Sequence, residues 1–315
     1  KISSFSDFEI LSMQLFKHQI KTNPFYKKYC KSLNTNLGKI NSITHIPFMP
    51  IDFFKTEKIL CNSVIPEKYF ISSGTSSSKK SKHYIESIEF YEKNITACFK
   101  EFWGDIHSYK FFCLTPEKKE AKNSSLVHMC DFFVKKTKHL ESGFYLNKDE
   151  KLKNDIIESQ KHKQPFILIG LTFSILDFAN KYKIKLTGGN IIETGGMKNQ
   201  KKEIIREELY DILTKKFQIN DIQSEYGMTE LLSQSYSLKN GEFMPPPWKK
   251  ILIRDKQNPL KINNNSTGGI NIIDLANIHS CAFIATDDFG FIKNKHFKVL
   301  GRLETASIRG CSTMV

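Results

Sequence analysis

The sequence predicts an α/β fold in which a largely parallel sheet is covered by helices and is followed by a small β lobe. Strand-like and helix-like segments alternate from residue 109 to residue 216, and short β-like runs replace them after residue 240. Alternation of this kind predicts parallel strands, because a parallel pair needs a long crossover that is usually a helix. Turn-rich Pro245 to Pro247 and Asn263 to Asn265 separate the later runs, which favours an antiparallel or barrel-like lobe.

The amino-terminal segments are expected to be mostly helical. Residues 1–45 read as two helices joined near Asn23 and Pro24, and an irregular apolar stretch punctuated by prolines follows from Ile46 to Phe54. Apolar residues recur at helical spacing from Ile85 to Phe102, which predicts a third helix.

The alternating middle of the chain supplies the predicted sheet. Its expected strands are 110–114, 164–170 and 190–193, and its expected helices are 124–133, 173–181 and 201–216. Ligands of such sheets collect beyond the carboxyl ends of the strands, where Glu193 to Gly196 and Glu225 to Glu230 would lie. The later β runs are 250–254, 269–274, 281–285 and 297–300. We therefore predict an α/β core over residues 1–240 and a β-rich lobe over residues 241–315.

Composition narrows the class of protein. The chain has 315 residues with 40% hydrophobic content, and its longest apolar stretch, Phe166 to Phe178, is too short and too interrupted to span a bilayer. No secretory layout opens the sequence, so we expect a soluble cytoplasmic protein without a transmembrane segment. Seven scattered cysteines without a Cys-x-x-Cys pair argue against a disulfide framework and a structural zinc site.

The net charge of +14 would permit binding to nucleic acid or another polyanion. Base readout depends on the planar fork of arginine, and only four of the 47 basic residues are arginines. The lysines are spread over the whole chain, so we predict no nucleic-acid partner.

The polar run from Ser72 to Lys80 is the clearest candidate site. It offers hydroxyls, backbone N–H groups around a glycine, and two ammonium groups, which together suit a phosphate-bearing ligand. A Walker A loop is an alternative, but Lys79 stands where that loop needs its second glycine. A solvated Ser/Lys linker is another. We expect this loop to lie at or just before the amino end of the helix predicted from Ile85.

A second segment, Ser224 to Glu230, decides between these alternatives. Together with the first loop it resembles the ANL superfamily of adenylate-forming enzymes, which carry a Ser/Thr/Gly-rich loop ending in lysine and a later Tyr-Gly-x-Thr-Glu motif. Ala285 to Gly290 and Gly301 to Arg302 are similar to two further segments of that superfamily. The stretches closest to its LuxE-type acyl-protein synthetases and phenylacetate-CoA ligase-like branch are 49–55, 193–198, 246–248 and 251–255.

The resemblance implies an ATP and Mg²⁺ site and assigns its residues. The implied phosphate ligands are Ser73, Gly74, Thr75, Ser76 and either Lys79 or Lys80, with Thr229 on the α-phosphate. Base and sugar contacts are implied for Tyr226, Gly227, Asp288 and Arg302, and Glu230 is the implied metal ligand. The double glycine at Gly195 and Gly196 would let the backbone approach a ligand closely, either at the adenine or at the acyl pocket. Alternatives stay open: a core aromatic for Tyr226, a helix-start carboxylate for Glu230, a plain turn at Gly195 and Gly196, and an acidic turn at Asp287 and Asp288.

The resemblance also implies the reaction. It predicts a ligase that forms an acyl adenylate from a carboxylic acid, with a fatty acid favoured, and passes the acyl group to a thiol. Cys311 lies where acyl-protein synthetases place an acyl-accepting cysteine, although it could be an inert terminal residue. The mobile carboxyl-terminal ANL domain is expected to be absent, and the expected partner is an acyl reductase or an acyl carrier protein. The rival functions are an acyltransferase or acyl-CoA ligase of the same fold and a non-catalytic nucleotide-binding subunit.

Overall fold

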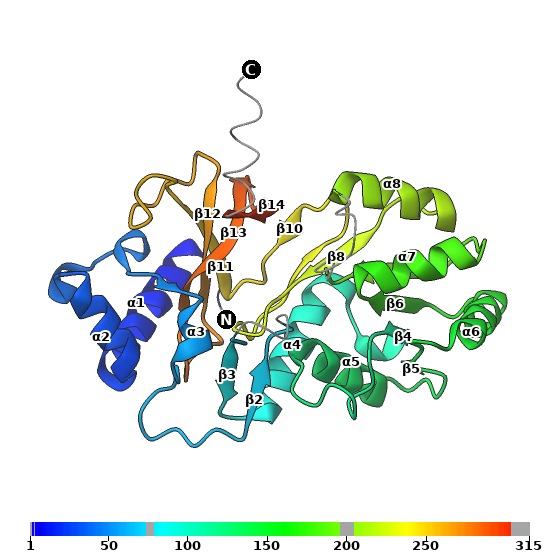
Figure 1. The fold of residues 1–315 in the computed structure, drawn as a ribbon, viewed down its shortest axis with the longest axis horizontal. Coiled ribbons are helices and arrows are strands. Elements are labelled where there is room, and N and C mark those ends of the chain that lie inside the picture. The colour runs from blue at the N-terminus through cyan, green and yellow to red at the C-terminus, as the bar shows by residue number, and fades with distance from the viewer. Residues whose placement is uncertain (1, 3, 74–78, 196–204, 304–315) are drawn as a thin grey trace. The chain divides into compact units, whose positions relative to one another are not determined.

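A computed structural model describes residues 2, 4–73, 79–195 and 205–303. Contacts group the chain into two compact units, whose boundaries fall within helix α4 (Ile88–Trp103) and at three later points. Unit 1 comprises residues 1–94, 228–233 and 244–315, and unit 2 comprises residues 95–227 and 234–243. Figure 1 traces the elements of both along the chain. None of the helices in the described ranges is long and apolar enough to cross a membrane.

Unit 2 is built on the predicted parallel sheet. Five strands pair in parallel in the order β5 (Gly143–Phe144), β4 (Lys110–Leu114), β6 (Phe166–Gly170), β7 (Gly189–Glu193) and β8 (Gln223–Tyr226). Strand β9 (Ser235–Ser237) then pairs antiparallel with β8. Its helices are α5 (Ser125–Lys136), α6 (Asp149–Lys161), α7 (Thr172–Lys181) and α8 (Arg206–Phe217), after a 3₁₀ turn at Ile106–Ser108. All five residues of β4 and of β6 are buried, as expected of strands covered on both faces.

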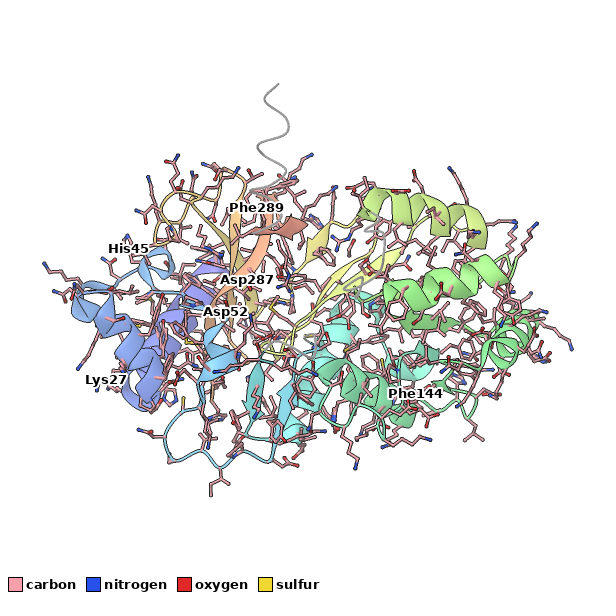
Figure 2. The ribbon with its side chains drawn as sticks, viewed as in Figure 1. Lys27, His45, Asp52, Phe144, Asp287 and Phe289 are labelled. Atoms are coloured by element: carbon pink, nitrogen blue, oxygen red, sulfur yellow. The ribbon has the colours of Figure 1, made fainter. Side chains whose placement is uncertain are left out.

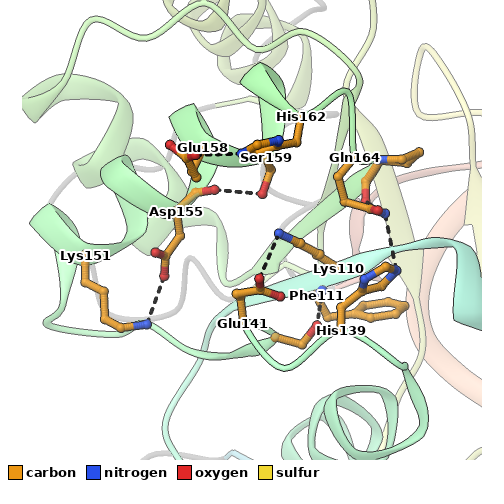
Figure 3. Close-up of polar contacts among 12 residues, drawn as sticks. Lys110, Phe111, His139, Glu141, Lys151, Asp155, Glu158, Ser159, His162 and Gln164 are labelled. Carbon is orange, nitrogen blue, oxygen red and sulfur yellow. Dashed lines mark hydrogen bonds and ion pairs between the residues drawn. The ribbon is translucent and has the colours of Figure 1, made fainter.

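The core of unit 2 is apolar, and its surface carries ion pairs. Phe112, Leu168, Ile191 and other fully buried residues of the sheet pack against side chains of α6, α7 and α8. On the outside, the carboxylate of Glu158 in α6 pairs with His162 at 2.8 Å (Figure 3). Exposed pairs of this kind contribute little to stability, so the apolar core holds the sheet.

Unit 1 combines the amino-terminal helices with the predicted β lobe. Strands β11 (Lys249–Arg254), β12 (Gly268–Asp274), β13 (Phe283–Lys293) and β14 (His296–Arg302) form an antiparallel sheet, and the short β1 (Met49–Pro50) pairs in parallel with β13. Helices α1 (Phe5–Thr22), α2 (Pro24–Ser32) and α3 (Phe53–Thr56) belong to the same unit, with 3₁₀ turns at Leu37–Lys39 and Ile43–His45. β10 (Phe243–Met244) lies at a unit boundary.

Buried amides explain why the first helices cluster with the last strands. The side chain of Gln19 donates to the carbonyl of Asn277 at 2.8 Å and accepts from the N–H of Ala282 at 3.0 Å. Asn23, which caps α2, donates to the carbonyl of Ser280 at 3.0 Å. The contact units therefore differ from the predicted division at residue 240. That division stays a prediction about folding domains, because contacts alone do not test which pieces fold independently.

The predicted phosphate loop does not lead directly into a helix. Strands β2 (Lys68–Ile71) and β3 (Lys82–Ile85) pair antiparallel on either side of it, and α4 begins only afterwards. The expectation that the loop lies at or just before the amino end of the helix predicted from Ile85 was therefore wrong, since strand β3 comes between them. Any anion held by this loop would depend on the loop's own donors and not on a helix dipole.

Candidate active site

The base of the Ser72 to Lys80 loop meets the Thr229 to Glu230 segment within unit 1. At the base, the N–H of Ser72 donates to the carbonyl of Ser81 at 3.1 Å, and the N–H of Ser81 donates to the hydroxyl of Ser72 at 3.0 Å. The hydroxyl of Ser81 also lies beside the carboxylate of Glu230, close enough to lower its pKa. Two motifs about 150 residues apart in the sequence therefore share a side-chain contact.

The Glu230 carboxylate lies in an enclosed environment. Its residue is 5% exposed, and burial raises its pKa, while the hydroxyl of Ser81, its own N–H and the charges of Arg302 and Lys55 oppose that rise. No helix begins here, because residues 227–234 belong to neither a helix nor a strand. The helix-start alternative for Glu230 is thus excluded.

Charged side chains from three elements gather around the middle of strand β13. The guanidinium of Arg302 lies 3.7 Å from the carboxylate of Asp287 and 4.0 Å from that of Asp288. The pairing of β1 with β13 brings Asp52 to the same region, where it pairs with Lys55, and Figure 2 shows Asp52 and Asp287 near each other. Burial and the charge of Asp52 raise the pKa of Asp287. Both Asp287 and Asp288 lie within β13, so the acidic-turn alternative was wrong.

A second polar cluster lies at the carboxyl end of β7 in unit 2. The buried carboxylate of Glu193 accepts hydrogen bonds from the hydroxyl of Thr172, the N–H of Gly195 and the hydroxyl of Ser224. Ser224 in turn contacts the hydroxyl of Tyr210. Gly195 has φ +78°, a left-handed conformation that glycine adopts without strain. The end of β7 is therefore fixed where the chain enters the predicted Gly195 and Gly196 turn.

Sequence comparison identifies the family. The acyl-protein synthetase family LuxE matches residues 7–315. This chain belongs to that family. It is 23% identical over 340 residues to the long-chain-fatty-acid--luciferin-component ligase of Aliivibrio fischeri, covering 96% of this chain and 86% of the relative. The ligase of the same name from Vibrio harveyi is 22% identical over 332 residues, covering 94% of this chain and 84% of the relative. The predicted family is confirmed, and the chain is an enzyme of the ligase class.

Solved structures with the same fold are adenylate-forming ligases. An open form of 2-hydroxyisobutyryl-CoA ligase, bound to its acyl-AMP and CoA, has a TM-score of 0.63 at 11% identity and covers 93% of this chain and 74% of its own. ATP-bound MatB from Rhodopseudomonas palustris has a TM-score of 0.56 at 11% identity, and O-succinylbenzoate CoA synthetase from Bacillus subtilis with ATP and magnesium has 0.54 at 12%. These cover 76% and 79% of this chain, which spans 49% and 53% of their lengths. The predicted ANL-type α/β fold is confirmed.

The predicted site residues of this acyl-protein synthetase are distributed over both units. Unit 1 contains Ser73 and Lys79 at the loop ends, Thr229, Glu230, Asp288 and Arg302, and unit 2 contains Gly195, Tyr226 and Gly227. Tyr226 is 9% exposed and its ring packs 5.6 Å from that of Phe243, so the core-aromatic alternative remains open. Gly74, Thr75, Ser76, Gly196 and Cys311 lie outside the described residues.

Sequence reasoning missed the side chains that hold the second motif. Asp274 accepts from the N–H groups of Leu232 at 3.0 Å and Ser233 at 2.9 Å, while His83 and Asn277 approach the carbonyls of Thr229 and Glu230. No spacing rule connects these positions, because their proximity depends on the tertiary fold. Asp52 and Lys55 could have been identified from the sequence, since they lie in one of the stretches that resemble LuxE-type relatives.

The described residues fit a Mg²⁺ ion that the protein and the nucleotide phosphates bind together. No group of three or more His, Cys, Asp or Glu side chains in the described ranges is placed to hold a metal ion alone. Mg²⁺ in nucleotide sites is usually bound by one or two carboxylates together with substrate phosphates and water. Glu230, a buried carboxylate beside the predicted phosphate loop, suits that arrangement.

Proposed function

We propose that this acyl-protein synthetase activates a long-chain fatty acid with ATP and transfers the acyl group to Cys311, from which a partner protein receives it. The contact between Ser81 and Glu230 carries the proposal, because it joins the base of the predicted phosphate loop to the predicted metal ligand. The names of the two fatty-acid ligases in Aliivibrio fischeri and Vibrio harveyi support the substrate class.

In the first step, a carboxylate oxygen of the fatty acid attacks the α-phosphorus of ATP. The new O–P bond gives the acyl adenylate, and the bond between the α- and β-phosphates breaks to release pyrophosphate. Mg²⁺, when bound, neutralises charge on the phosphate oxygens. Ser73, Thr75, Ser76 and Lys79 would bind phosphate, Thr229 would donate to the α-phosphate, and Glu230 would hold the ion. Tyr226 and Gly227 would contact the base, with Asp288 and Arg302 at the ribose. Gly195 and Gly196 would approach either the adenine or the acyl group. Catalysis here consists mainly of positioning and charge neutralisation.

In the second step, a cysteine thiolate attacks the acyl carbon and AMP leaves. The six described cysteines are all buried, with Cys61, the least enclosed, at 3% exposure. Burial raises the pKa of Cys30 to about 12 and also raises the pKa of Cys61, Cys113 and Cys281, so these thiols stay protonated at neutral pH. Buried protonated thiols are poor nucleophiles. This exclusion supports Cys311, the seventh cysteine, as the acceptor.

Pyrophosphate exchange with saturated fatty acids of increasing length tests the first step, and intact mass after incubation with ATP and the best acid tests the second. We expect exchange with long-chain acids and a mass increase of one acyl group, which hydroxylamine removes and which Cys311→Ser abolishes while exchange persists. Exchange without a mass increase, together with acyl-CoA formation when CoA is added, would favour a CoA ligase. Nucleotide binding without exchange for any acid would favour a non-catalytic subunit.

The acceptor beyond Cys311 is inferred from chemistry. A protein thioester is a high-energy acyl donor, so the fitting partner is an acyl reductase or an acyl carrier protein that takes the group from the thiol. We infer a cytoplasmic location, where ATP and reduced thiols are both available.

A further inference from the structure

Two side chains bind the backbone of the predicted catalytic residues from one side. Ring nitrogen Nδ1 of His83 lies 2.8 Å from the carbonyl oxygen of Thr229, and Nε2 lies 3.0 Å from Oδ1 of Asn277. The amide nitrogen of Asn277 donates to the carbonyl of Glu230 at 2.9 Å. His83 and Asn277 are both 1% exposed, so water does not compete for these contacts.

The Thr229 to Ser233 segment depends on such contacts for its position. It lies outside every helix and strand, so no ladder of backbone hydrogen bonds fixes it. On its other side Asp274 accepts from the N–H groups of Leu232 and Ser233. Asn94 and Lys249 donate to the carbonyls of Leu232 and Ser233 at 2.7 and 2.9 Å. Side chains therefore hold the segment by four carbonyls and two N–H groups, and they set where the hydroxyl of Thr229 and the carboxylate of Glu230 lie.

The hydrogen-bond donors and acceptors around His83 indicate which ring nitrogen carries the proton. Burial lowers the pKa of His83, so the ring is neutral and has a single N–H. A proton on Nδ1, with the amide of Asn277 donating to Glu230, satisfies both backbone carbonyls. Any other placement leaves one buried carbonyl without a donor, which is costly. The arrangement with both carbonyls satisfied leaves Nε2 and Oδ1 of Asn277 facing each other as two acceptors.

We propose that His83 is a positioning residue for the proposed adenylation site, and that it acts by donating a hydrogen bond from Nδ1 to the carbonyl of Thr229. The inference rests on the proposed function only for its catalytic consequence. Nε2 of His83 and Oδ1 of Asn277 are then two acceptors that face each other, because the single ring proton is on Nδ1, where it bonds to the carbonyl of Thr229. The Nδ1 bond therefore serves the geometry of the segment at the expense of the contact between His83 and Asn277.

Two substitutions separate the two ring nitrogens. In His83→Asn the amide nitrogen reaches about as far as Nδ1 and keeps the bond to Thr229, so the rate of pyrophosphate exchange should stay close to that of the natural enzyme. In His83→Gln the amide nitrogen reaches about as far as Nε2 and binds Asn277 instead. We expect the glutamine variant to be at least as stable in urea as the asparagine variant, yet to lose kcat by about 10- to 100-fold with an unchanged KM for the fatty acid.

A merely structural role predicts the opposite, because activity would then follow stability. Asn23→Ala is the control: this equally buried asparagine in unit 1 caps α2 and binds Ser280. Its loss should lower stability while kcat per folded molecule is unchanged. Equal kcat for the two His83 variants, or a larger loss in His83→Asn, would overturn the proposal.

Long-range ¹H–¹⁵N spectra of the natural protein without nucleotide give a second test that needs neither variant nor activity. They should show a neutral His83 ring protonated at Nδ1, and a proton on Nε2 would overturn the proposal. Absence of exchange in the natural enzyme would instead overturn the proposed function, and the spectra would still decide the hydrogen bond.

Discussion

Glu193 in unit 2 and Glu230 in unit 1 are buried to the same extent, at 4% and 5% exposure, but they are partnered very differently. The carboxylate of Glu193 accepts from two hydroxyls and a backbone N–H contributed by three separate positions. The carboxylate of Glu230 lies beside the hydroxyl of Ser81 and its own N–H, and burial raises its pKa. A carboxylate can accept about four hydrogen bonds, so Glu230 retains more capacity for a cation.

The difference shows that burial alone does not mark a functional carboxylate. Glu193 lies at the end of a parallel strand, where ligands often bind, yet its oxygens are occupied in tying β7 to β8 and to helix α7. Glu230 lies in a segment without regular structure and is surrounded by the charges of Arg302 and Lys55. We therefore interpret Glu193 as structural and keep Glu230 as the proposed metal ligand.

The largest effect is expected for Glu230→Gln. An amide is a poor ligand for Mg²⁺, so magnesium-dependent pyrophosphate exchange should fall by about 100-fold or more. The fold should be more stable at pH 7, because burial disfavours the ionised form of the natural carboxylate and raises its pKa. Exchange kinetics over a magnesium series and urea unfolding measure the two effects. A variant that loses stability, or one that exchanges normally, would contradict the assignment.

Strands and short motifs could be predicted from the sequence, because their residues are contiguous. The side chains that contact the motif from elsewhere in the chain could not. Strand 110–114 was predicted with its exact bounds because it is a short, buried and mostly apolar run. The four late β runs overlap β11 to β14, because turn residues separate their apolar parts. Thr229 and Glu230 were found because they belong to one short motif. Ser81, His83 and Asn277 were not, because their roles depend on contacts between residues as far as 194 positions apart.

The sequence pattern also failed to predict helices and strands that are stabilised mainly by contacts with a neighbouring element. Strands β2 and β3 have four residues each, and three of the four residues in β2 are at least partly exposed, so neither shows the signal of a strand by itself. Helix α6 is so polar that its residues gave no apolar face to recognise; only Leu152, Ile156 and Ser159 are buried. Pairing across the loop and packing against the sheet define these elements.

Glu193→Gln should show an intermediate effect that is confined to stability. The substituted side chain keeps its shape but carries an N–H group where one of the three donors now points, so at least one buried group is left without a partner. We expect a loss of about 2 to 3 kcal/mol in the free energy of unfolding. Urea unfolding measures it, and the magnesium dependence of the remaining exchange activity should be unchanged. A shift in that dependence would mean that Glu193 also contributes to the metal site.

Substitution of Asp131 in α5 should have the smallest effect on stability. It tests how hydrogen-bond donors and burial oppose each other in setting a carboxyl pKa. Burial alone would raise the pKa of this carboxyl, but hydrogen bonds from Lys118 and Lys135, each at 2.8 Å, lower it below its ordinary value. A depressed carboxyl pKa stabilises the fold above the unfolded value near 3.8, and the contribution is lost as the pH falls through the folded pKa.

Asp131→Asn should therefore cost about 0.5 to 1 kcal/mol at pH 7, a modest value because both lysines are exposed and solvent screens them. The difference from the natural protein should shrink as the pH falls below 3.8 and through the lowered pKa of the folded state, which urea unfolding over an acid pH series measures. A difference that persists in acid would show that the shape of the side chain matters more than its charge. Disappearance in acid would show that at Asp131 the donors outweigh burial, which is the reverse of the balance at Glu230, where burial raises the pKa.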